Sequence, residues 1–157
     1  MSRRLTALVI GNAAYPGPSK LKNPRNDADD IATRLEACGF SVVKKIDCSN
    51  VDLDRALKNF KTALTGNDVG LFFFAGHGMQ IDGKNYLATV DTNIEGEVEA
   101  KHSSLRLNRV IDMLEKAGTS PNIIVLDACR DNPFERAWQR SSANRGLAPV
   151  YAHSPIP

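Results

Sequence analysis

Apolar and polar positions along the chain form two alternating patterns, which predict strands and helices in turn. Four continuous apolar runs predict buried parallel strands, at residues 5–11, 40–46, 69–76 and 122–128. Apolar positions spaced three or four residues apart predict three helix faces. These faces comprise Ala28, Ile31, Leu35 and Cys38; Leu53, Ala56, Leu57, Phe60 and Leu64; and Leu107, Val110, Ile111 and Leu114. Each face is followed by a glycine, the residue that most often ends a helix.

The order of these elements predicts the fold class. Strands and helices alternate, which favours an α/β domain with a mostly parallel sheet and helices on both of its faces. An Asp-Gly turn within residues 79–91 predicts a small surface hairpin. The run at 122–128 reads as the most buried strand, and the polar, proline-containing residues 139–157 read as a loop and tail.

Composition and charge narrow the class without naming a partner. The 157 residues suit one domain, and a net charge of +2 spread along the chain gives no reason to expect nucleic-acid binding. No apolar run reaches the length that crosses a bilayer, so we expect no membrane association and a cytoplasmic protein. Three cysteines without metal-type spacing predict neither a disulfide framework nor a zinc site.

Two reactive side chains follow the third and fourth predicted strands. His77 ends the run "FFFAGH" and Cys129 ends "IIVLDAC". Because ligands gather at the carboxyl ends of parallel strands, we expect the imidazole and the thiol to face one crevice, where the imidazole takes the thiol proton. The N–H groups of Gly78 and Cys129 would then stabilise an oxyanion. The alternatives are an inert buried cysteine and a turn histidine.

The motifs "AGHG" (75–78) and "DAC" (127–129), each closing an apolar strand, resemble those of the caspase superfamily of cysteine peptidases. The stretches "LKNPRNDADDIATRL" (21–35) and "DACRDNPF" (127–134) are similar to those of its prokaryotic, metacaspase-like members. The resemblance covers roughly residues 5 to 150. It implies a caspase-like three-layer α/β/α sandwich, with a peptidase domain at residues 1–150 equivalent to a large subunit and a tail at 151–157.

The resemblance also implies roles for individual residues. It makes Cys129 the nucleophile, His77 its base or ion-pair partner, and Asp27 and Asp127 the acids that select arginine or lysine before the scissile bond. From the residues alone, Asp27 serves equally well as a helix cap. Asp127 is harder to explain without a partner, because a carboxylate at the end of a buried strand is costly.

Departures from the family leave other readings open. The chain ends 28 residues after Cys129, where relatives add two strands, and Pro24 stands near the place of a family cysteine. We therefore keep a catalytically silent interaction module as the alternative, and expect a symmetric homodimer that pairs the uncovered sheet edge. A nucleotide-binding domain is disfavoured because "VIGNAAYPG" lacks phosphate-loop spacing.

The substrates expected are proteins or peptides, with self-cleavage plausible after Arg140 or Arg145 in the tail. No organic cofactor or metal site is expected. Calcium activation stays open, although the following acids have the spacing of an ordinary surface loop: Asp91, Glu95, Glu97 and Glu99. Of the other histidines and cysteines, His102 and His153 are read as solvated, Cys38 as part of an apolar helix face, and Cys48 as a turn residue.

Overall fold

A computed structural model describes residues 3–64 and 68–129 of the chain. The tail, with Arg140, Arg145 and His153, lies outside these residues. Along the chain the elements are β1 (Leu5–Gly11), the short 3-10 helix η1 (Gly17–Ser19), α1 (Pro24–Ala37), β2 (Ser41–Ile46), α2 (Asn50–Ala63), β3 (Val69–Ile81), β4 (Lys84–Ala88), α3 (Glu97–His102), β5 (Ser104–Arg106), α4 (Leu107–Ala117) and β6 (Asn122–Cys129).

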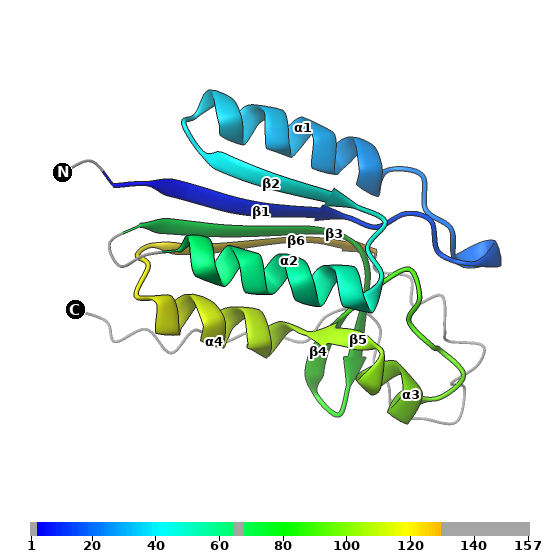
Figure 1. Cartoon of the computed structure of the whole chain (residues 1–157). Coiled ribbons are helices and arrows are strands. Elements are labelled where there is room, and N and C mark those ends of the chain that lie inside the picture. Colours follow the sequence, from blue (N-terminus) through cyan, green and yellow to red (C-terminus); the bar gives the residue numbers. More distant parts are fainter. Residues whose placement is uncertain (1–2, 65–67, 130–157) are drawn as a thin grey trace.

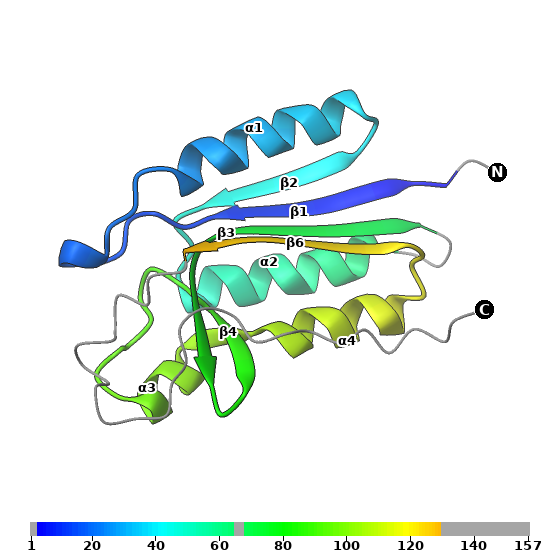
Figure 2. The same cartoon turned by 180° about the vertical axis from the view of Figure 1, so that it is seen from behind.

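The predicted mostly parallel α/β sandwich is confirmed. Strands β2, β1, β3 and β6 lie side by side and run parallel, and β4 and β5 extend the sheet antiparallel from the second half of β3. Helix α1 covers one face of the sheet, whereas α2 and α4 cover the other (Figures 1 and 2). This division follows from the crossover rule: the step from β1 to β2 moves in one direction across the sheet, and the later steps to β3 and β6 move in the opposite direction.

Two apolar layers hold the helices on the sheet. Phe72 and Phe74 of β3 are 0% exposed and pack with α2 and α4. Burial of each such side chain stabilises the fold by roughly 1.5–3 kcal/mol. On the other face, Phe73 packs in a smaller cluster with Ala28 of α1. Because successive strand residues point to opposite faces, the continuous apolar run of β3 serves both layers at once.

The hairpin prediction is correct in its turn but wrong in its setting. Asp82 and Gly83 both adopt positive φ, 51° and 74°, as expected of an Asp-Gly turn that joins two antiparallel strands. However, β3 runs without a break from the parallel sheet into the hairpin, and residues 85–88 of β4 are buried. The hairpin is therefore part of the main sheet and lies over a third apolar cluster that includes Tyr15, Met79 and Tyr86.

The strand predicted to be the most buried is an edge strand in the described part of the chain. Strand β6 pairs with β3 alone there, and Val125 is 40% exposed. Helix α1 packs on β1, β2 and β3, which leaves the same face of β6 uncovered by any described helix. Most of the buried positions that the sequence pattern assigned to β6 belong instead to β3.

Candidate active site

The site lies where the chain reverses its direction of travel across the sheet. The connection that leaves β1 goes to α1 on one face, whereas the crossovers on the far side of β3 use α2 and α4 on the other (Figure 1). Loops that diverge in this way leave room at the carboxyl ends of the strands between them. The loop of residues 12–23 and the last parallel residues of β3 meet at this position.

His77 lies inside β3 and not at its end, which corrects the expectation from sequence. It is the last residue of β3 in parallel register with β6, and its register partner is Cys129. The next residue, Gly78, is opposite Leu87 in the antiparallel hairpin. The two predicted reactive residues are therefore adjacent across two neighbouring strands, as the sequence reasoning required. Registered residues of neighbouring strands are roughly 5 Å apart between Cα atoms.

The imidazole of His77 is buried, with 3% of the residue exposed. Its Nε2 lies 2.6 Å from the carbonyl oxygen of Ser19. A carbonyl oxygen only accepts, so Nε2 carries the proton in this contact, and in the neutral ring Nδ1 is the basic nitrogen. Burial lowers the pKa of His77, and the Ser19 carbonyl opposes this shift only in part. The ring is thus held neutral and in one tautomer.

Three residues of the 12–23 loop that sequence reasoning passed over hold this region together. Asn12 is fully buried; its Oδ1 accepts from the Cys48 N–H at 2.8 Å, and its Nδ2 donates to the Ala88 carbonyl at 3.3 Å. Tyr15 contacts His77, and Ser19 supplies the carbonyl described above. The only sequence signal was the position of "GNAAYPG" directly after the first strand. None of these residue types suggests catalysis by itself.

Asp27 and Asp127 are brought together from opposite ends of the chain. Asp127 is opposite Ala75 in register, and Ala75 belongs to the apolar cluster on the α1 face of the sheet. Asp27 lies in the first turn of α1, on that same face. Partial burial raises the pKa of Asp27, and a side-chain hydrogen bond with Asp127 and the nearby negative charge raise it further. The two carboxyl groups therefore share a proton more readily than isolated aspartates.

The alternative explanations for these two acids fare differently. The N-cap of α1 is Asn23, so Asp27 is not the cap, although its negative charge in the first turn still suits the helix dipole. Asp127 is exposed, since β6 is an edge strand in the described part, and the expected cost of burying its carboxylate does not arise.

The remaining candidates lie away from this site. Cys38 is exposed at the end of α1 and not on its apolar face. Cys48 is 2% exposed, and burial, followed by the charge of Asp52, raises the pKa of its thiol to about 11, which makes it inert at neutral pH. His102 ends α3, where a loop was expected, and is exposed as predicted. Within residues 3–64 and 68–129 no group of three His, Cys, Asp or Glu side chains could hold a metal ion.

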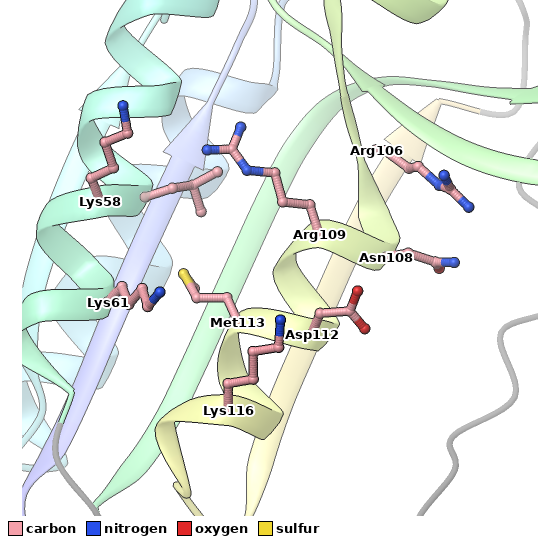
Figure 3. A pocket seen from close by; sticks show the side chains of 9 residues that line it. Lys58, Lys61, Arg106, Asn108, Arg109, Asp112, Met113 and Lys116 are labelled. Atoms are coloured by element: carbon pink, nitrogen blue, oxygen red, sulfur yellow. The ribbon is translucent and has the colours of Figure 1, made fainter.

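A groove of about 510 Å³ lies on the opposite face, between α2 and α4 (Figure 3). Its lining is mostly cationic and comprises Lys58, Lys61, Arg106, Arg109 and Lys116, together with Leu57, Asn108, Asp112 and Met113. Lys58 and Arg109 both pair with Asp54. The groove contains no thiol or imidazole and is at no strand end, so it is separate from the site at His77.

Comparison with known proteins agrees with this architecture. A family model described as "Caspase domain" matches residues 4–152. The chain is 28% identical over 130 residues to human mucosa-associated lymphoid tissue lymphoma translocation protein 1, covering 83% of the chain and 15% of that protein. It is 27% identical over 131 residues to zebrafish caspase b, covering 82% of the chain and 31% of that protein. The chain thus spans less than a third of the length of either relative.

Solved structures share the fold. The crystal structure of the Drosophila initiator caspase Dronc matches with a TM-score of 0.62 at 12% identity, over 82% of this chain and 50% of that one. A protein of Geobacter sulfurreducens matches with a TM-score of 0.62 at 20% identity, over 80% and 50% of the two chains. No described helix is both long enough and apolar enough to span a bilayer.

Proposed function

Because this chain belongs to the caspase domain family of cysteine peptidases, we propose that it is a cysteine endopeptidase with Cys129 as nucleophile and His77 as proton acceptor. The observation that carries the proposal is the parallel register that makes His77 and Cys129 partners on neighbouring strands. A thiol becomes a strong nucleophile only as the thiolate, and an adjacent imidazole is the usual means of generating it.

In the proposed reaction, the Cys129 thiol gives its proton to Nδ1 of His77, because Nε2 is occupied by the Ser19 carbonyl. The thiolate then attacks the scissile carbonyl carbon, and the N–H groups of Gly78 and Cys129 stabilise the oxyanion. The imidazolium returns its proton to the leaving amine, and a thioester remains. A water molecule gives a proton to the imidazole, attacks the thioester and releases the acid product and the free thiol.

We further propose that Asp27 and Asp127 select arginine or lysine before the scissile bond. The two acids lie together at the start of α1 and near the end of β6, one residue pair before the register of His77 and Cys129 has run out. Two carboxylates in contact repel each other, and a guanidinium placed between them relieves that repulsion. This specificity, like the catalytic roles, is a proposal for the chain.

A labelling experiment tests the catalytic proposal. The protein is incubated with peptides that carry a thiol-reactive warhead after arginine, lysine or aspartate, with and without calcium. We expect one equivalent of label on Cys129 and none in Cys129→Ala. Cys38→Ala is the matched control, because it removes an exposed thiol far from the site and should be labelled like the wild type. A wild type that neither labels nor cleaves would instead favour the silent interaction module.

Fluorogenic peptides test the specificity. We expect faster cleavage after arginine or lysine than after aspartate, and Asp127→Asn should lose about tenfold or more of that preference, since one buried charge contact is worth at least that factor. Faster cleavage after aspartate by the wild type would overturn the assignment of Asp27 and Asp127 while leaving the catalytic proposal intact.

A further inference from the structure

Tyr15 touches His77 from two directions. Its ring lies against the imidazole, with centroids 4.5 Å apart and planes inclined at 56°. Its hydroxyl accepts from the backbone N–H of His77 at 3.1 Å. The side chain therefore limits both where the imidazole can lie and where the backbone that bears it can move.

The same hydroxyl ties this pair to a third segment. It donates to the carbonyl oxygen of Ala88, the last residue of β4, at 2.8 Å. One buried phenol thus joins the 12–23 loop, the centre of β3 and the end of β4. Tyr15 is 5% exposed, so water does not offer a ready substitute for either hydrogen bond.

Gly76 shows how closely the tyrosine approaches β3. A Cβ atom at residue 76 would come within 2.6 Å of the Tyr15 hydroxyl and within 2.9 Å of the Phe74 ring. Only a residue without a side chain leaves room for the hydroxyl at this place. The glycine before His77, read from the sequence as a means of turning the backbone, serves here to admit Tyr15.

We propose that Tyr15 is a positioning residue that holds the His77 imidazole in its single orientation and tautomer; this inference rests on the proposed function of His77 as proton acceptor. The loop that bears Tyr15 also bears Ser19, whose carbonyl fixes Nε2. When the hydroxyl is lost, two buried backbone groups lose their partner, the loop shifts, and the imidazole is no longer aligned with Cys129. Misalignment of this kind slows chemistry without weakening substrate binding.

The test compares Tyr15→Phe with Tyr86→Phe. Tyr86 belongs to the same apolar cluster and is also buried, and no hydrogen bond from its hydroxyl to His77 is found in the described part of the chain. We expect kcat to fall about ten- to hundredfold in Tyr15→Phe with KM nearly unchanged, and both constants to stay within about twofold of wild type in Tyr86→Phe. Equal kcat in wild type and Tyr15→Phe would overturn the proposal.

A second readout does not depend on activity. In the Cys129→Ala background, ¹⁵N NMR of the His77 ring reports the tautomer directly. We expect well-separated Nδ1 and Nε2 signals in the parent and in Tyr86→Phe, and signals that approach each other in Tyr15→Phe as the tautomers mix. If the wild type proves inactive, the catalytic proposal fails, yet this measurement still decides whether Tyr15 orients the ring. Unchanged ring signals in a folded Tyr15→Phe would refute that role.

Discussion

At the scale of single residues, the imidazole of His77 is held in surroundings that oppose its protonation. Burial lowers its pKa from the ordinary value of 6.5, so the folded protein binds this proton less readily than the unfolded chain does. Between the lowered pKa and 6.5, the unfolded state carries more protons. The folded state is therefore destabilised as the pH falls through this window, and at higher pH the effect is absent.

We predict that the melting temperature falls between about pH 7 and the lower limit of this window, and that the fall is smaller in His77→Asn. Differential scanning calorimetry across this range measures it. His102→Asn is the control, since it removes an exposed imidazole and should keep the wild-type pH dependence. Parallel curves for the wild type and His77→Asn would contradict the prediction.

At the scale of elements, helix α1 approaches β1 very closely. A Cβ atom at Gly11 would lie 2.6 Å from the Pro24 carbonyl oxygen and 2.7 Å from the Ala28 Cβ, both of which belong to α1. Neither atom is the free end of a flexible side chain. Any residue larger than glycine must therefore push the first turn of α1, which bears Asp27, away from the sheet.

We predict that Gly11→Ala lowers the free energy of unfolding by about 1–3 kcal/mol, as overpacking does in a tight core. Urea denaturation followed by circular dichroism measures this loss. Gly96→Ala is the matched control, because the added Cβ would meet only the flexible carboxylate of Glu99. A Gly11→Ala protein as stable as Gly96→Ala would show that α1 yields at little cost.

How far the sequence predicted these elements depends on what each pattern reports. The helices were correct because Leu107 and Leu114 lie on one apolar face and Gly118, at φ 72°, ends α4 as expected. Burial of β6 was overestimated because "IIVL" shows that a strand is apolar but not how many neighbours it has. His77 and Cys129 were placed by strand order and register, whereas Tyr15 acts through a tertiary contact that no local pattern reports.

At the scale of the whole molecule, the outer edge of β6 has no partner strand among residues 3–64 and 68–129. An uncovered edge presents backbone N–H and C=O groups that readily pair with another strand. A twofold axis beside β6 would let two copies pair these edges and continue one sheet through both molecules.

We predict a homodimer of this kind at tens of micromolar protein, with twice the chain mass by multi-angle light scattering. Val125→Pro should disrupt it, because proline removes an N–H and is tolerated in strands only where no hydrogen bond is required. Val43→Pro, on the opposite edge strand β2, is the control and should leave the mass unchanged. A monomer mass for the unmodified protein would rule out the dimer.

The contact between Asp27 and Asp127 has a further consequence, in the exchange of protons with the buffer. The raised pKa of Asp27 means that the empty site retains a proton to a higher pH than an ordinary aspartate would. A guanidinium bound there favours the ionised pair, so binding must expel that proton. We predict that the enthalpy for binding an arginine peptide to Cys129→Ala at about pH 5 differs between two buffers of unequal ionisation enthalpy. With Asp27→Asn added, the two enthalpies should agree; equal values without that change would mean that no proton leaves. The site would then act as a small proton source that releases its proton each time a basic residue enters.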